Sequence, residues 1–173
     1  MIAPGHALTL LSGVLEPGER VLYAIRPDIR VTIRNKLILW WIGVPLGVAM
    51  TSLYVTGRIP LSVAAPFLLI ALALTLAPIL LAIDTRYTVY AVTDRRALIV
   101  HSGLRPGSAS CPFAQMDDKL EILTAGGRGG HVYFASNMPT RQRDVDYTGR
   151  IAFRDLADPH EAAAQIDAAR KRA

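Results

Sequence analysis

The chain has 173 residues, enough for one ordinary domain and little more. Hydrophobic residues make up 51% and charged residues 19%, whereas a typical soluble domain carries about 25% charged residues. The net charge is only +5, and no block of like charge is longer than Arg170-Lys171-Arg172, so the composition excludes the usual signature of a nucleic-acid-binding protein. A single cysteine, Cys111, excludes an intramolecular disulfide, and we expect a buried thiol rather than a reactive one.

The N-terminal segment, residues 1–36, is predicted to contribute the first strand of the main domain. We expect no secretory signal peptide, because the apolar stretch from Ala7 to Leu11 is short and no basic region precedes it. Arg20 to Ile25 is rich in strand-forming residues and is bounded by Pro17-Gly18 and Pro27, so it is predicted as a strand.

Residues 37–83 are predicted to form a transmembrane hairpin. Leu37 to Val55 is a run of 19 residues without a charge, and Ile59 to Ile83 is a run of 25. About 20 helical residues cross a hydrocarbon core of ~30 Å. Thr56-Gly57-Arg58 is long enough only for a tight turn, so the two helices are antiparallel. Buried core helices would show similar runs, but a chain of this length is too short to surround two helices that are apolar all round.

Basic residues flank the hairpin on one side of the predicted membrane. The positive-inside rule places both flanks and both termini in the cytoplasm and the turn at Arg58 outside. A basic residue beside an anionic leaflet also gains about 1 kcal/mol. For Asp94, Arg95 and Arg96 the structural interpretation is favoured, in which Asp94 and Arg95 form a hairpin turn with a local ion pair. The alternative is that Arg95 or Arg96 contacts lipid phosphate or a partner. The candidate contacts to headgroups or to a partner are Arg26, Arg30, Arg34, Lys36, Arg86, Arg95 and Arg96.

Residues 84–173 are predicted to form the rest of a cytoplasmic domain. Asp158, Pro159 and Glu161 provide the N-cap, N1 and N3 signals of a helix over 159–172. About seven short strands followed by one amphipathic helix suggest a partly open barrel or sandwich plugged by that helix. Runs of β-branched and aromatic residues between turn signals predict strands at 87–93, 96–102, 110–113, 119–124, 131–134 and 150–153.

Three phrases of the chain resemble a known family. They are LEPGERVLYAIRPD (Leu15 to Asp28), RYTVYAVTDRRALIV (Arg86 to Val100) and FRDLADPHEAAAQIDAAR (Phe153 to Arg170). With the two-helix hairpin and a glycine-rich turn, these phrases resemble the bacterial membrane proteins with a PH-like domain, most specifically in Y-x-x-T-D-R-R-x-L-I at Tyr90 to Ile99.

The resemblance implies a multi-pass protein of the bacterial inner membrane with a membrane α+β fold. Its PH-like domain would be a partly open seven-stranded barrel, capped by the C-terminal helix, with the hairpin inserted after the first strand. The long loop around Arg141 to Asp146 departs from the family pattern and leaves the pairing of the last strand open. The family offers no catalytic residues to transfer.

No catalytic, cofactor-binding or metal-binding constellation emerges from the sequence. The glycine cluster at 126–130 lacks the Gly-Lys-Ser/Thr ending of a phosphate-binding loop and is predicted as a hairpin turn. The four histidines lack metal-ligand spacing. Asp117 and Asp118 are adjacent, so on an extended chain they point to opposite sides. We therefore expect neither enzyme activity nor a cofactor.

Three hypotheses follow for function. The favoured one is a non-enzymatic, membrane-tethered PH-like binding or scaffold module that contacts anionic lipid headgroups and a protein partner or a second copy of itself, but no nucleic acid. The alternative is an assembly or maturation factor for another membrane protein complex. An enzyme on lipid or envelope substrates ranks below both, because Asp84 with Arg86 is its only adjacent candidate pair. In the alternative, partner helices would meet small residues such as Gly43, Gly47, Ala71 and Ala73.

The topology can be tested with two reporters. A reporter that works only in the cytoplasm should be active when fused after Ala173, and one that works only outside should be active when inserted at Arg58. The physical reason is that positive charges are retained on the cytoplasmic side. Activity of both insertions on the same side of the membrane would contradict the hairpin.

Overall fold

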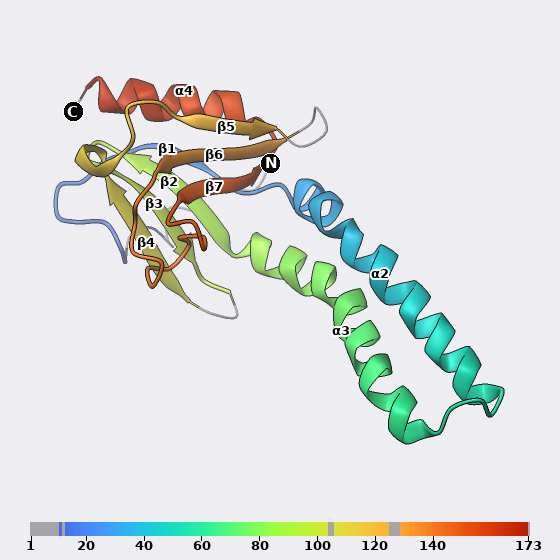
Figure 1. Ribbon diagram of the computed structural model, residues 1–173. Coiled ribbons are helices and arrows are strands. Elements are labelled where there is room, and N and C mark those ends of the chain that lie inside the picture. The colour runs from blue at the N-terminus through green and yellow to red at the C-terminus, as the bar shows by residue number, and fades with distance from the viewer. Residues whose placement is uncertain (1–10, 12, 104–105, 125–128, 173) are drawn as a thin grey trace. The chain divides into compact units, whose positions relative to one another are not determined.

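The computed structural model describes residue 11 and residues 13–103, 106–124 and 129–172. Two compact units divide it, one formed by the chain up to Val31 and from Asp84 onward, here called the β-domain, and one formed by Thr32–Ile83. The predicted hairpin after the first strand, the seven strands and the C-terminal helix are all present (Figure 1). In chain order the elements are β1 (Val21–Ile25), α2 (Ile29–Val55), α3 (Leu61–Arg86), β2 (Thr88–Thr93), β3 (Arg96–His101), β4 (Gly107–Pro112), the short 3-10 helix η1 (Phe113–Gln115), β5 (Glu121–Thr124), β6 (Gly130–Ala135), β7 (Ile151–Leu156) and α4 (Pro159–Arg170).

The strands of the β-domain form two antiparallel sheets. One sheet has the order β1-β2-β3-β4 and the other has the order β5-β6-β7. No ladder joins the two sheets among the described residues, so the strands do not form a closed barrel. The fold is of the α+β class, with two separate sheets. The last strand, β7, pairs with β6, with Val132 opposite Phe153. This register settles the pairing that the sequence left open.

Strand β2 is buried on both of its faces. Because side chains alternate along a strand, Tyr90 and Val92 enter the main core, while Val89 and Ala91 enter a second cluster that includes Leu11. The main core joins the two sheets, since Tyr90 stacks on Phe153 with ring centroids 4.8 Å apart. The second cluster is covered by the chain before β1, which the sequence analysis did not predict.

Helix α4 covers the main core as predicted. Asp158 is its N-cap and accepts a hydrogen bond from the Glu161 N–H at 3.0 Å, which satisfies one of the free donors of the first turn. Pro159 occupies the first helical position, where a missing N–H is harmless. The helix ends at Arg170, slightly before the predicted residue 172. Its buried face consists of Pro159, Ala162, Ala163, Ile166 and Ala169.

Helices α2 and α3 form an antiparallel hairpin in the second unit. Both helices are long and apolar enough to cross a membrane, and little of their apolar surface is buried, unlike the core helices of a soluble protein. Gly57 adopts a positive φ of 71° in the turn between them, a conformation that glycine reaches without steric cost. The helices are longer than the predicted apolar runs, because α2 begins at Ile29 and α3 ends at Arg86.

Gly43 sets the closest approach of α2 to α3. A Cβ atom at Gly43 would lie 2.9 Å from Leu74 Cβ, 2.9 Å from Thr75 Oγ1 and 3.1 Å from the Ala71 carbonyl oxygen. A Cβ atom at Gly47 would lie 3.5 Å from Ala71 Cβ, which is an ordinary contact. The two glycines therefore belong to the contact within the hairpin, although their spacing had suggested a contact with partner helices.

We expect Gly43→Ala to destabilise the hairpin by about 1–3 kcal/mol, because the added methyl group overpacks the contact with α3. Gly47→Ala is the matched control. It should be neutral or slightly stabilising, since alanine favours a helix over glycine by roughly 1 kcal/mol. Thermal unfolding in detergent measures both variants, and equal effects of the two substitutions would contradict this packing.

Candidate functional site

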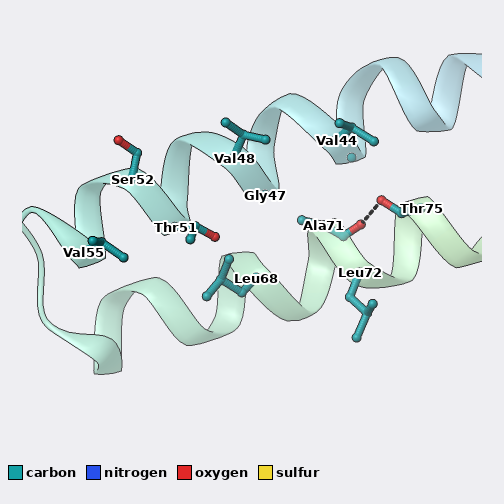
Figure 2. A pocket seen from close by; sticks show the side chains of 11 residues that line it. Val44, Gly47, Val48, Thr51, Ser52, Val55, Leu68, Ala71, Leu72 and Thr75 are labelled. Carbon is teal, nitrogen blue, oxygen red and sulfur yellow. Dashed lines mark hydrogen bonds between the residues drawn. The ribbon is translucent and has the colours of Figure 1, made fainter.

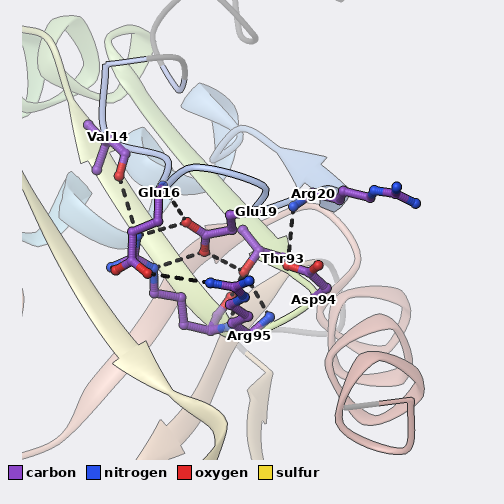
Figure 3. A network of polar contacts seen from close by, with 8 residues as sticks. Val14, Glu16, Glu19, Arg20, Thr93, Asp94 and Arg95 are labelled. Atoms are coloured by element: carbon purple, nitrogen blue, oxygen red, sulfur yellow. Dashed lines mark hydrogen bonds and ion pairs between the residues drawn. The ribbon is translucent and has the colours of Figure 1, made fainter.

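A buried carboxylate fastens the chain before β1 to the β2–β3 turn (Figure 3). The side chain of Glu19 is fully buried and receives two hydrogen bonds from the Arg96 guanidinium, from Nε at 2.9 Å and from Nη2 at 2.8 Å. The Thr93 hydroxyl donates to Glu19 Oε1 at 2.8 Å, and the Glu16 N–H donates to Oε2 at 2.9 Å. Such a two-pronged pair holds both groups in one geometry.

This network shows what two residues of the T-D-R-R phrase do in the fold, since Thr93 and Arg96 both bind the Glu19 carboxylate. The hydrogen bonds from Arg96, aided by those from the Glu16 N–H and Thr93, lower the pKa of Glu19 to about 2 against the opposing effect of burial. The same carboxylate raises the pKa of Arg96. Arg96 is therefore engaged within the fold rather than offered to a headgroup. The two partners lie 77 residues apart in the chain, and no feature of a single sequence indicated that they meet.

Arg95 lies at the surface of the same turn. Its guanidinium is 3.7 Å from the Glu16 carboxylate, and both side chains are more than half exposed. Asp94 instead accepts a hydrogen bond from the Arg20 N–H at 3.1 Å. The partner of Arg95 is thus Glu16 and not the adjacent Asp94, which corrects the expected local ion pair. An exposed pair of this kind contributes little to stability.

A second polar chain joins Thr88, His101 and Asp144. His101 Nε2 lies 2.9 Å from both carboxylate oxygens of Asp144, and Nδ1 lies 2.9 Å from the Thr88 hydroxyl. The hydroxyl is also 3.2 Å from the Asp84 carbonyl oxygen. The sequence analysis missed this arrangement, because Asp144 comes from a loop 43 residues after His101 and carries no recognisable motif.

The order of groups resembles that of a hydrolytic triad, in which a carboxylate orients an imidazole that activates a hydroxyl. Thr88, however, is only 4% exposed, so its hydroxyl cannot be reached by a substrate in this conformation. The loop is also held by Gln142, which donates to the Ser110 carbonyl at 3.3 Å, and by Arg143, which donates to the Pro106 carbonyl at 2.9 Å. We therefore interpret the Thr88–His101–Asp144 hydrogen bonds as contacts that anchor the loop to the sheet.

Cys111 is fully buried, as the sequence predicted. Burial raises the pKa of its thiol to about 11. Because the thiolate is the nucleophilic form, this cysteine is chemically inert at neutral pH.

Two of the predicted basic residues line a cavity of the β-domain. The cavity has a volume of about 470 Å³, within the roughly 300–1,000 Å³ of small-ligand sites. Arg26 follows β1 and Arg86 precedes β2, and the antiparallel pairing of these strands, with Ile25 opposite Tyr90, brings the two arginines to the same end of the sheet. The lining residues are Arg26, Pro27, Ile29, Thr85, Arg86 and Tyr87.

The other predicted basic residues lie on the first turns of α2. Arg30, Arg34 and Lys36 follow one another along the helix before its uncharged stretch begins at Leu37. The structure thus separates the seven candidates into three groups, which are the cavity arginines 26 and 86, the helix residues 30, 34 and 36, and the β2–β3 turn residues 95 and 96.

An apolar groove of about 630 Å³ runs along the hairpin (Figure 2). Small residues form its floor, and the Thr75 hydroxyl in its wall donates to the Ala71 carbonyl at 2.7 Å. Of the small residues that the sequence analysis offered for partner helices, Gly43, Gly47 and Ala71 line this groove, whereas Ala73 lies on the exposed surface of α3. No charged residue in the described part of the chain lines the groove, and its polar side chains are the hydroxyls of Thr51, Ser52 and Thr75.

Comparisons of the chain with models of protein families, with curated proteins and with solved structures found no match.

The Glu19–Arg96 pair makes a pH-dependent prediction. Because the pKa of Glu19 falls from 4.5 to about 2 on folding, its charged form stabilises the fold by about 3 kcal/mol. This contribution is complete above pH 4.5 and is lost as the pH falls towards 2. Glu19→Gln should therefore lower the free energy of unfolding by about that amount at neutral pH, and the difference from the wild type should close in acid.

Urea unfolding between neutral pH and pH 2 measures this difference. Glu16→Gln is the control, because Glu16 also contacts Arg96, at 3.1 Å, but is 55% exposed. Its loss should stay below about 1 kcal/mol. A gap between wild type and Glu19→Gln that does not change with pH would show that the carboxylate charge is not the stabilising feature.

Proposed function

We propose that this protein is a non-enzymatic, membrane-tethered binding or scaffold module with a PH-like domain on the cytoplasmic side of the bacterial inner membrane. The observation that carries the proposal is the place of the apolar hairpin within the fold. It is inserted between β1 and β2, which are adjacent strands of one sheet. Membrane insertion of the hairpin would therefore tether the β-domain by two connections at once.

Both connections between the strands and the hairpin are short. Three residues separate β1 from α2, and one residue separates α3 from β2. Four basic residues lie in or beside these connections, namely Arg26, Arg30, Arg34 and Arg86. Each basic residue near an anionic surface adds about 1 kcal/mol, so the proposed tether would hold the domain against the headgroups.

The PH-like assignment rests on the order of elements. The resemblance of the three sequence phrases implies seven strands and one capping helix, with a hairpin inserted after the first strand, and the elements follow this order along the chain. The non-enzymatic assignment rests on the polar clusters. Glu19 pairs with Arg96, and His101 pairs with Asp144; the side chains of both pairs are buried or half-buried. Because these polar groups are engaged in holding the fold together, they support a binding role over a catalytic one.

The assembly-factor alternative would use the hairpin. Gly43 packs tightly against α3, but Gly43, Gly47 and Ala71 also line the apolar groove along the hairpin, so a partner helix would have to bind in that groove. In the favoured proposal the partner binds the β-domain, where Tyr147 is 94% exposed in a hydrogen-bonded turn. The turn is held by Asp146, which accepts hydrogen bonds from the Thr148 and Arg150 N–H groups. Exposed tyrosines on rigid supports are typical anchors of protein interfaces.

Photo-crosslinking in native membranes tests the proposed function. A photoreactive residue replacing Tyr147 should capture one recurrent protein, or a second copy of the chain, because this side chain is the most exposed large hydrophobic one among the described residues. The matched control carries the same probe at Arg58 in the hairpin turn, which should not yield that adduct. Absence of any specific adduct at 147, with the chain integrated in the membrane, would contradict a scaffold role for this surface.

A further inference from the structure

The cavity lined by Arg26 and Arg86 has the chemistry of an anion site. Both guanidinium groups lack an ion-pair or hydrogen-bond partner among residues 11, 13–103, 106–124 and 129–172. In this respect they differ from Arg96, which is fully engaged by Glu19. Two positive charges at one cavity repel each other, and an anion between them would relieve that repulsion.

The neighbouring carboxylates do not line this cavity. Asp28 caps α2, where its Oδ1 accepts a hydrogen bond from the Arg30 N–H at 2.8 Å. Asp84 is directed towards Gly103. A Cβ atom added at Gly103 would lie 2.5 Å from the Oδ1 atom of Asp84. Neither carboxylate is among the lining residues. The polar lining is therefore the two guanidinium groups with the side chains of Thr85 and Tyr87.

In the proposed membrane arrangement, Arg86 would lie at the level of the phospholipid headgroups because of its position along α3. Arg86 follows Ile83, the end of the uncharged stretch, by three residues, which is about 4.5 Å along a helix. The polar layer on each side of the hydrocarbon core is roughly 5–7 Å thick. Tyr87 beside it is 49% exposed, and tyrosine prefers this interfacial layer.

We infer that the cavity holds the phosphate of a single anionic phospholipid, clamped between Arg26 and Arg86. A guanidinium matches phosphate oxygens with two parallel N–H donors, and basic pockets at the ends of membrane helices are suited to lipid headgroups. Pro27 and Ile29 supply the apolar wall for the glycerol and the start of the acyl chains. This inference rests on the proposed membrane tether and adds a discrete one-to-one site to its diffuse attraction for anionic lipid.

Lipid retention by the full-length chain in a neutral detergent tests the site. After incubation with phosphatidylglycerol, native mass spectrometry should show one retained lipid, and phosphatidylcholine should be retained about tenfold less. Arg26→Gln and Arg86→Gln should each weaken retention by about tenfold, the loss expected for one charge-assisted contact. The two effects should not add, because both groups hold one phosphate.

Arg141→Gln is the matched control, because it removes the same charge from an exposed residue that does not line the cavity and is not among the candidate headgroup contacts. Its retention should stay within about twofold of the wild type at physiological salt, where exposed charges are screened. Thermal unfolding checks that all three variants are folded, and phosphorus NMR of the wild type reports the bound phosphate without any substitution.

Four results would overturn the inference. They are equal losses for Arg141→Gln and Arg26→Gln, no retained lipid, equal retention of phosphatidylcholine, and displacement of the lipid by inorganic phosphate, which would indicate a site for a free anion. Each of these results leaves the crosslinking at position 147 and the membrane integration of the chain unaffected, so failure of the lipid site is distinguishable from failure of the proposed function.

Discussion

β1 and β2 are hydrogen-bonded neighbours although 62 residues of chain lie between Ile25 and Thr88. Closing so long a connection costs conformational entropy, and the cost is reduced because most of the insert folds back on itself as a helical hairpin. At one end of the strand pair, the ladder brings Arg26 and Arg86 to a common cavity. At the other end, Arg20 and Asp94 exchange hydrogen bonds beside the Glu19–Arg96 pair. The candidate site and its supporting network both depend on this pairing.

The environment, rather than residue type, separates the basic side chains into different roles. Arg96 faces a fully buried carboxylate at 2.8 Å, so any external anion would have to compete with a pair that is already desolvated. Arg26 and Arg86 face a cavity without such a carboxylate. An external anion at this cavity would not have to displace a carboxylate that lines it, and a lipid phosphate is the partner we propose.

In the loop after β6, polar side chains that resemble a catalytic arrangement serve to anchor the loop. Asp144 adopts a positive φ of 63°, a strained backbone that persists only where surrounding contacts support it. Its bonds to His101 and the neighbouring contacts of Gln142 and Arg143 supply that support. They also cover part of the edge of β4, which reduces the exposure of an unpaired strand. The strain is explained by loop anchoring, in agreement with the proposal of a binding module.

Local patterns in the sequence were sufficient for the elements themselves. The uncharged runs predict α2 and α3, alternation and β-branched residues predict the strands, and Asp158-Pro159 predicts the start of α4, because each of these signals lies within a few residues. The contacts between elements required the tertiary structure. The Glu19–Arg96 pair, the Thr88–His101–Asp144 chain, the engagement of Gly43 within the hairpin and the meeting of Arg26 with Arg86 all join residues distant in sequence. Periodicity reports which face of an element is apolar, but it does not specify which distant residue lies opposite, and that choice depends on strand register and helix packing.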